Sequence, residues 1–545
     1  MRNMTRVFLI VFGTICTVLM GLDPVARSSS AGGLSKECGS LQSVDFTSVV
    51  DAPTQLIKTT FVEGDSATPP YCLAEGYVVP TVGFILVLPS LWNGKFMEVG
   101  CGGHCGALPN GKLPPRSIWD CGIALRRGYV CVTSDAGHRG AGGDGLWAYG
   151  NLQAKIDWGF RAPHVVALAG KALAEHYYGK PIVASYFLGG STGGRQALQE
   201  AQRFPLDFKG IVAIAPPVDL SYVYMSFAWG FQALHDKDGN PLLGGEELKL
   251  VTEAALAKCD MDDGVRDGVI SDPLHCSFDP ESLICKVTSE SRCLTPSQVD
   301  AVKKVYSGPM TSTGSRLSLG GPVVGSEWGG KDRNPNVGWE FSYLEKSGYQ
   351  ALAIEGLRFL FFWPERIGRW DLHDFDFDHD PQRLEVMQAI FDSSNPDLRA
   401  FKAGGGRLLI FQGLNDNSVL PRKTIDYYNT VERTMGGDKQ TQSFFRLFLL
   451  PGVGHGNGGM GADAVDYLGI LEDWMDKDRA PDRIIAAHLK SNSSTNEVAG
   501  TTLSFPLDPA SVQFTRPVYP YPTRAKYKGR GDTNDANNFE PVAPQ

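Results

Sequence analysis

The fold is decided by one stretch of the chain, Ile182-Val-Ala-Ser-Tyr-Phe-Leu-Gly-Gly-Ser-Thr-Gly-Gly-Arg-Gln196. Residues 182–188 are mostly apolar and predict a buried strand. Small residues then surround Ser191 in a G-x-S-x-G pattern, and residues 195–203 favour a helix. This order exposes a serine hydroxyl at a helix N-terminus, where backbone N–H groups favour negative charge. A Gly-rich phosphate loop is the alternative, but no G-K-[ST] sequence follows.

The same alternation of strands and helices extends to both sides of Ser191. Helical spacing of apolar residues predicts a helix over 161–178. Strands separated by helices imply a parallel sheet covered on both faces. Together with the serine turn, the pattern predicts an α/β-hydrolase fold with a large inserted lid domain. The predicted strands cover residues 83–89, 128–135, 182–188, 210–216, 407–413 and 445–451.

The chain has 545 residues, which is too long for one compact core. After residue 216 the strand pattern stops, and it resumes only after residue 400, so the core is interrupted by an insertion. We expect the segment after Tyr527, which is rich in Gly, Asn and Asp, to be irregular. The predicted division is a signal peptide at 1–31, a first core part at 32–216, a lid domain at 217–400, and a second core part with the C-terminal tail at 401–545.

The N-terminus has the layout of an export signal. Arg2 and Arg6 precede the apolar run from Val7 to Leu22, and small residues follow up to Ala31. Cleavage near Ala31 is expected, with a retained anchor as the alternative. Removal of the signal leaves ten cysteines, and an even count in an exported chain indicates disulfides rather than a metal site. We therefore expect a secreted or periplasmic protein that has no membrane attachment after cleavage.

A serine nucleophile needs a base and an orienting acid, which α/β-hydrolases supply in the chain order Ser, Asp or Glu, His. His455 lies in a Gly-rich loop just after the last predicted core strand and is our candidate base. Asp416 follows the strand at 407–413 and is the candidate acid, with a plain Asx turn as the alternative. Surface or packing roles are expected for four other histidines, of which His488 is placed on a polar, helix-like segment: His104, His138, His164 and His488.

An oxyanion that forms during ester cleavage needs two N–H donors. The residue after the nucleophile, Thr192, is expected to supply the first. The second is expected from Gly102 or Gly103, in the glycine- and cysteine-rich loop 100–106 that follows a short strand. Of these two, Gly103 is our choice, and a tight loop held by cysteines is compatible with that role.

These residues together resemble the tannase and feruloyl esterase family over nearly the whole chain. The resemblance implies an α/β-hydrolase core, a large lid that closes over an aromatic acyl group, and hydrolysis through an acyl-enzyme. It is carried by Leu91-Trp-Asn-Gly-Lys-Phe, Thr133-Ser-Asp-Ala-Gly-His138, Gly190-Ser-Thr-Gly-Gly-Arg-Gln196, Glu200-Ala-Gln-Arg-Phe-Pro205, Phe208-Lys-Gly-Ile-Val212 and Tyr527-Lys-Gly.

The chain departs from the family at one pair of positions near the nucleophile. Members of the family have a disulfide between the residue before the serine and the residue after the histidine, and here these residues are Gly190 and Gly456. We predict that the two Cα atoms still lie within about 4.4–6.8 Å. A second C-terminal cysteine pair is replaced in the same way by Tyr519 and Glu540.

For the ten cysteines, the resemblance and local spacing together suggest three bonds. The other four cysteines are expected to form two further bonds near loop 100–106, with their pairing left open: Cys101, Cys105, Cys121 and Cys131. The three suggested bonds are Cys38–Cys72, Cys259–Cys276 and Cys285–Cys293.

An Asp- and Gly-rich turn in the lid is suited to a hard cation, because its carboxylates follow one another at short spacing. The family resemblance assigns a structural Ca²⁺ to the side chains of Asp260, Asp263 and Asp267 and to the carbonyls of Val265 and Val269. A plain Asp-Gly turn is the alternative interpretation.

The sequence favours a serine carboxylic-ester hydrolase that acts on small esters of aromatic acids, of feruloyl, galloyl or terephthaloyl type. The alternative is a ligand-binding protein of the same fold that is non-catalytic or has altered specificity. A net charge of −9 argues against nucleic acid as a partner. The sequence does not decide the acyl group or the oligomeric state.

Overall fold

The computed structural model describes residues 31–65, 68–108, 121–286, 292–327, 338–344, 348–490 and 505–543. The predicted signal peptide at 1–31 lies outside the described residues except for Ala31, which begins helix α1 (Ala31–Ser40). Among the residues that are described, none of the helices combines the length and the apolar character needed to cross a membrane.

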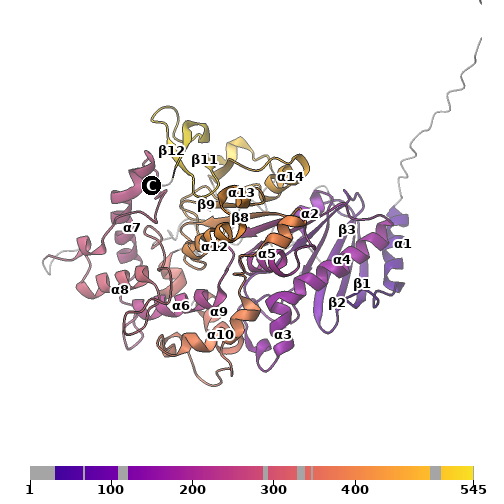
Figure 1. The fold of residues 1–545 in the computed structure, drawn as a ribbon, viewed down its shortest axis with the longest axis horizontal. Helices are drawn as coiled ribbons and strands as arrows, with labels where there is room; N and C mark the ends of the chain where they lie inside the picture. Colours follow the sequence, from indigo (N-terminus) through magenta and orange to yellow (C-terminus); the bar gives the residue numbers. More distant parts are fainter. Residues whose placement is uncertain are drawn as a thin grey trace, which may run out of the picture.

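A nine-stranded sheet forms the centre of the molecule, with strand order β1-β2-β3-β5-β4-β6-β7-β8-β9 (Figure 1). The six strands predicted from the sequence are all present in it, as β3, β5, β6, β7, β8 and β9. The strands are β1 (Thr54–Val62), β2 (Tyr71–Val78), β3 (Val82–Pro89), β4 (Lys95–Val99), β5 (Val130–Ser134), β6 (Ala184–Gly190), β7 (Gly210–Ile214), β8 (Arg407–Gly413) and β9 (Phe445–Leu450).

The sheet is mixed, whereas the sequence pattern predicts a parallel one. Strands β5, β4, β6, β7, β8 and β9 are parallel to one another, but the pairs β1–β2, β2–β3 and β3–β5 are antiparallel. Only three residues separate β2 from β3. A connection this short can join only antiparallel strands, because a parallel crossover needs a dozen residues or more.

Helices cover both faces of the sheet, and alternate strand residues enter two separate cores. In β3, for example, Phe84 and Leu86 enter one core while Ile85 and Val87 enter the other. Helices α4, α5 and α12 pack in the first core, and α2 and α14 pack in the second. These helices are α2 (Gly122–Arg126), α4 (Ala162–Tyr178), α5 (Thr192–Arg203), α12 (Pro421–Met435) and α14 (Tyr467–Lys477).

The insertion, residues 217–400, lies between β7 and β8, which are hydrogen-bonded neighbours in the sheet. In Figure 1 its helices gather at the end of the molecule away from β1 and α1. Because β7 and β8 pair directly, the parallel part of the sheet is continuous in space although it is interrupted in sequence. The main helices between these strands are α6 (Leu220–Leu234), α7 (Gly245–Cys259), α8 (Pro296–Ser307), α9 (Gly348–Glu355), α10 (Asp380–Phe391) and α11 (Arg399–Ala403).

Two antiparallel strand pairs complete the C-terminal part: β10 (Ile484–Leu489) with β11 (Val512–Val518), and β12 (Arg524–Tyr527) with β13 (Phe539–Val542). Two expectations were therefore wrong. The segment after Tyr527 is not wholly irregular, because β13 pairs with β12. His488 lies in β10 rather than on a helix, and its Nδ1 hydrogen-bonds the Gly461 carbonyl at 2.7 Å. Short strands that pair across the chain leave little periodicity to detect.

The ten cysteines that follow residue 31 all form disulfides. The three bonds suggested by the family resemblance are confirmed, and the remaining four cysteines pair as Cys101–Cys105 and Cys121–Cys131. The first of these closes a loop of only five residues around Gly103. A set of structural disulfides fits a protein that folds in an oxidising, extracellular-type compartment.

Candidate active site

Ser191 occupies a sharp turn between β6 and α5. Its backbone has φ 51° and ψ −123°, which a non-glycine residue seldom adopts, and the side chain is partly exposed. Small neighbours are required here, because a Cβ on Gly189 would lie 2.4 Å from the Gly193 carbonyl oxygen. Likewise, a Cβ on Gly100 would lie 2.6 Å from the Gly193 Cα. The strained turn therefore depends on the glycine-rich sequence that predicts it.

His455 and Asp416 meet in the loops that follow β9 and β8. His455 Nδ1 lies 2.8 Å from Asp416 Oδ2, and the Asp416 side chain is completely buried. The other carboxylate oxygen accepts the backbone N–H groups of Ser418 and Val419 at 2.8 and 2.9 Å. Asp416 thus forms an Asx-type turn and also accepts a hydrogen bond from His455.

The environment of His455 makes its imidazole a stronger base than an isolated buried histidine. Burial by itself lowers the pKa of His455, but the negative charge of Asp416 and the hydrogen bond to it outweigh burial, and the net pKa is raised above the ordinary value. Because Nδ1 faces a carboxylate, Nδ1 carries a proton and Nε2 of the neutral ring is left as the acceptor.

Thr192 and Gly103 lie together beside Ser191. The Thr192 hydroxyl donates to the Gly103 carbonyl at 2.7 Å, which joins α5 to the loop after β4. Among the described residues, the N–H groups of Thr192, Gly102 and Gly103 find no acceptor, while the neighbouring N–H of Cys101 donates to the Gln196 side chain at 3.1 Å. Unpaired N–H groups next to a serine can bind a developing oxyanion.

Aromatic side chains of the insertion pack on the His455 and Asp416 loops. The Tyr349 ring stands edge-on to His455, with ring centroids 6.2 Å apart, and it also packs against Phe341 and Phe227. The Tyr343 hydroxyl donates to the Asn417 carbonyl at 3.0 Å, directly after Asp416. Sequence reasoning did not find the contacts of Tyr349 with His455 and of Tyr343 with Asn417, because each joins residues more than 70 positions apart and has no local pattern.

The acidic turn of the insertion contains the predicted residues, and two of its carboxylates contact other groups of the protein. Asp260 accepts the Gly268 N–H at 3.2 Å, and Asp267 forms a 2.6 Å ion pair with Arg516 of β11. Burial, followed by the charge of Asp267, raises the pKa of Asp263 to about 7. Within the described ranges, no group of three His, Cys, Asp or Glu residues is arranged to hold a metal ion. The hard oxygen donors of the turn suit Ca²⁺ in type.

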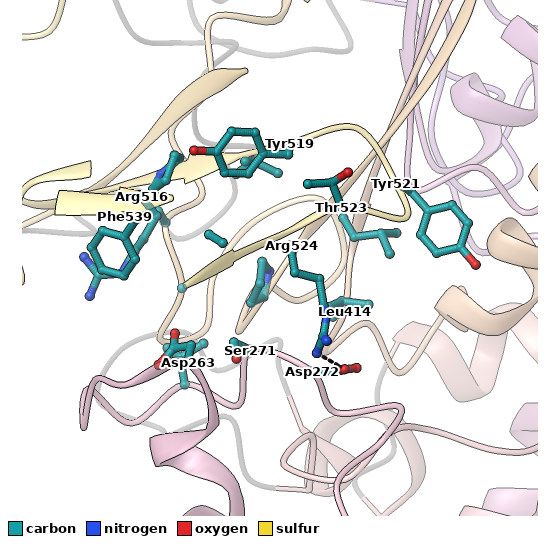
Figure 2. Close-up of a pocket in the computed structure, with 18 of the residues that line it drawn as sticks. Asp263, Ser271, Asp272, Leu414, Arg516, Tyr519, Tyr521, Thr523, Arg524 and Phe539 are labelled. Carbon is teal, nitrogen blue, oxygen red and sulfur yellow. Dashed lines mark hydrogen bonds and ion pairs between the residues drawn. The ribbon is translucent and has the colours of Figure 1, made fainter. Parts of the chain in front are cut away.

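A cavity of about 160 Å³ lies between this acidic turn and the C-terminal strands (Figure 2). Arg524 reaches across it to form an ion pair with Asp272, and aromatic residues such as Tyr519 and Phe539 form part of the wall. Neither Ser191 nor His455 lines this cavity. It is therefore separate from the place where an ester would meet the serine.

The structure describes both glycines that replace the family's cysteine pair, Gly190 and Gly456. The Gly456 N–H donates to the Gly454 carbonyl at 2.8 Å and its φ is +75°, where side chains are disfavoured. A cysteine at this position carries strain that a glycine avoids. The distance predicted between the two Cα atoms stays a prediction.

Comparison with known proteins agrees with this fold. The family model described as tannase and feruloyl esterase matches residues 71–542. An uncharacterized esterase of Xanthomonas campestris pv. campestris is 32% identical, covering 92% of this chain and 89% of that protein. The mono(2-hydroxyethyl) terephthalate hydrolase of Piscinibacter sakaiensis is 30% identical, covering 96% and 93%. The crystal structure of feruloyl esterase B from Aspergillus oryzae superposes with a TM-score of 0.78 at 25% identity, covering 93% and 100%.

The fold is that of the α/β-hydrolases, with the large insertion after β7. The chain belongs to the tannase and feruloyl esterase family. It is accordingly a carboxylic ester hydrolase that acts on small-molecule esters.

Proposed function

We propose that this enzyme cleaves its ester through an acyl-enzyme on Ser191. The observation that carries the proposal is the buried Asp416, whose carboxylate holds the proton of His455 at Nδ1 and leaves Nε2 as the proton acceptor. His455 takes the proton of the Ser191 hydroxyl while the serine oxygen bonds to the ester carbonyl carbon. Thr192 and Gly103 donate their N–H groups to the carbonyl oxygen as it becomes negative.

The tetrahedral intermediate collapses when the C–O bond to the alcohol breaks and His455 returns the proton to the leaving oxygen. Water then attacks the acyl-serine carbonyl, His455 accepts a proton from that water, and the acid leaves as Ser191 regains its proton. Asp416 stays ionised throughout and stabilises the imidazolium that forms twice in each cycle.

We infer that the acyl part of the substrate is aromatic, in the range of feruloyl, galloyl or terephthaloyl groups. The support is Tyr349 of the insertion, whose ring packs against His455, together with Phe341 and Phe227, which pack against Tyr349. Aromatic rings pack against one another edge-to-face or offset, which favours a flat ring over an aliphatic chain. The names of the related proteins, a feruloyl esterase and a terephthalate monoester hydrolase, support the same class.

The decisive test compares Ser191→Ala with the wild-type enzyme on methyl ferulate, methyl gallate and p-nitrophenyl esters. We expect kcat to fall by at least about 10⁴-fold, since little beyond oxyanion binding remains without the nucleophile. Ser282→Ala, an exposed serine of the insertion, is the matched control and should keep full activity. A fluorophosphonate probe should add one phosphonyl group to wild type and none to Ser191→Ala.

Two outcomes would overturn the assignment. Full turnover by Ser191→Ala would show that another group attacks the ester. A phosphonate adduct on wild type together with no turnover on any aromatic ester would favour the alternative, a binding protein or a hydrolase with a different specificity.

We also propose that the acidic turn binds a structural Ca²⁺ through the side chains of Asp260, Asp263 and Asp267 and the carbonyls of Val265 and Val269. The ion would neutralise repulsion between neighbouring carboxylates and hold the turn, and it would take no part in ester chemistry. Burial first, and the charges of Asp267 and Asp260 after it, raise the pKa of Asp263, and a bound cation would offset both effects, which supports this proposal.

We further propose that the protein is exported, with cleavage of the signal near Ala31. The five disulfides support this destination, because such bonds persist in oxidising compartments. Mass measurement of the N-terminus of protein recovered from the periplasm or the medium tests the cleavage position.

A further inference from the structure

His104 is completely buried in the loop that carries Gly103, and both of its ring nitrogens have partners. Nδ1 lies 2.9 Å from the carbonyl oxygen of Asp144, and Nε2 lies 2.8 Å from the hydroxyl of Tyr224. Tyr224 belongs to α6, the first helix of the insertion. A single side chain therefore connects the loop beside the nucleophile to the insertion.

The partners define which atoms donate. A backbone carbonyl can only accept, so His104 Nδ1 must carry the proton that the Asp144 carbonyl receives. Burial lowers the pKa of His104 to about 4, so the ring is neutral and Nε2 has no proton. The Tyr224 hydroxyl must then donate to Nε2. The result is a directed chain of hydrogen bonds from α6 through His104 to the 139–145 loop.

The residue next to His104 is held from several sides. The Gly103 carbonyl accepts from the Thr192 hydroxyl at 2.7 Å, and the His104 N–H donates to the Gly142 carbonyl at 2.7 Å. Gly103 has φ +57°, and a Cβ there would lie 2.4 Å from the Gly142 oxygen. The Gly102 carbonyl, which shares a peptide unit with the Gly103 N–H, accepts the Cys105 N–H at 2.9 Å, so the direction of the Gly103 N–H depends on how the residues on both sides of His104 are held.

Tyr224 is in turn fixed by the insertion. A Cβ on Gly356 would lie 2.7 Å from its ring, and Phe361 packs edge-on against it with ring centroids 5.5 Å apart. The Tyr224 hydroxyl can therefore reach His104 only when α6 and the segment around Gly356 are seated against each other.

We propose that His104 and Tyr224 are positioning residues for ester hydrolysis, which hold the Gly103 N–H in place for the oxyanion and make that placement depend on the seating of the insertion. The inference rests on the proposed function, because it assumes that Gly103 donates to the oxyanion. Neither side chain touches the reacting atoms. Their effect is on the geometry of a donor that matters most in the transition state.

The test is Tyr224→Phe, which removes one hydroxyl and leaves the ring that packs against Phe361. We expect kcat on a p-nitrophenyl aryl ester to fall by about tenfold, below the 10²- to 10³-fold that loss of a whole oxyanion donor causes. KM should change by less than about twofold, because the displaced donor acts mainly in the transition state. The rate of phosphonylation of Ser191 should fall by the same factor as kcat.

Tyr222→Phe is the matched control. Tyr222 lies one half-turn away on the same helix, is buried, and donates its hydroxyl to the Gly320 carbonyl at 2.5 Å, but it does not contact the Gly103 loop. Both variants lose one buried hydrogen bond, so a purely structural role predicts similar losses in melting temperature and similar kcat values. The proposed role predicts a loss of kcat in Tyr224→Phe alone.

A double variant distinguishes coupling between His104 and Tyr224 from general damage to the fold. In His104→Phe the acceptor for Tyr224 is already gone, so adding Tyr224→Phe should produce no further loss of kcat. Additive losses in the double variant, or equal kcat values for Tyr224→Phe and Tyr222→Phe, would overturn the inference. Ser191→Ala is measured in the same assay: if it stays active, the proposed function has failed, and if it is inactive the result bears on His104 and Tyr224 alone.

Discussion

Replacement of Asp416 by Asn tests the buried acid most directly, because it removes a charge and keeps the shape. Oδ1 accepts the N–H groups of Ser418 and Val419, so the amide oxygen of Asn must take that position. The NH₂ group then occupies the place of Oδ2, which now accepts from His455 Nδ1 at 2.8 Å and from Gln412 Nε2 at 3.2 Å. The His455 Nδ1–H and the Gln412 Nε2–H would therefore both point at another donor, the NH₂ group of the asparagine.

Gln412 cannot relieve this conflict by rotating its amide. Its Nε2 donates to the carbonyls of Gly413 and Val419 at 3.1 Å each, and its Oε1 accepts the Thr424 hydroxyl at 3.0 Å. The remaining response is a change at His455, whose Nδ1 must become the acceptor and whose Nε2 must carry the proton. In that tautomer the ring cannot take a proton from Ser191.

The expected loss of kcat is about 10⁴-fold, the size seen when a triad aspartate becomes asparagine in a serine protease. This factor corresponds to about 5 kcal/mol of transition-state stabilisation. The assay is steady-state hydrolysis of a p-nitrophenyl aryl ester between pH 6 and 9, with the melting temperature measured in parallel. Activity should recover partly at high pH, where hydroxide can replace the missing base.

Asp236→Asn is the matched control for Asp416→Asn. Asp236 accepts two backbone N–H groups, those of Asp238 and Asn240, both at 2.9 Å, and it lies in the insertion outside the candidate active site. We expect wild-type kcat from this variant, because an asparagine keeps the turn. A kcat for Asp416→Asn within tenfold of wild type, in a protein that melts normally, would refute the role assigned to Asp416.

Three further predictions concern stability. Burial lowers the pKa of His104 to about 4 and that of His138 to about 3. Below pH 6.5 the unfolded chain therefore binds two protons that the folded protein does not bind. In urea unfolding, these two histidines should lower the unfolding free energy by about 2.7 kcal/mol for each unit that the pH falls between 6 and 4. His138→Phe should remove about half of that slope, and an unchanged slope would contradict it. The double variant Gly190→Cys with Gly456→Cys should form a disulfide that adds about 2–4 kcal/mol to the unfolding free energy. Strain at the left-handed backbone of position 456 should reduce this gain by about 1–2 kcal/mol. Two free thiols by mass spectrometry would show that the Cα atoms lie too far apart. Calcium at 100 times its Kd should add about 2.7 kcal/mol to the unfolding free energy, Asp263→Asn should abolish the gain, and a melting temperature indifferent to both Ca²⁺ and EDTA would rule out the site.

Local patterns were sufficient to predict the core of this protein. The strand, turn and helix around Ser191 are contiguous, so their periodicity and glycine content can be read directly. His455 and Asp416 could be chosen because each follows a buried strand, and the ends of parallel strands meet at one edge of the sheet. Their hydrogen bond agrees with that choice.

What the sequence could not determine are the contacts between distant segments. Three features depend on where whole elements pack: the pairing of β12 with β13, the antiparallel edge of the sheet, and the disulfide between Cys101 and Cys105. The same holds for His104, which the sequence indicates only as a surface or packing residue. Its bond to Tyr224 joins residues 120 positions apart.

The sequence by itself therefore determined the fold class, the family and the order of the candidate catalytic residues, because each of these is set by short-range pattern and turn chemistry. Tertiary structure alone decided how Asp416 is held by four donors, which proton His104 carries, and which aromatic rings of the insertion stand beside His455. The physical reason is that hydrogen bonds and ring contacts between distant segments depend on three-dimensional packing, which leaves no periodic trace along the chain.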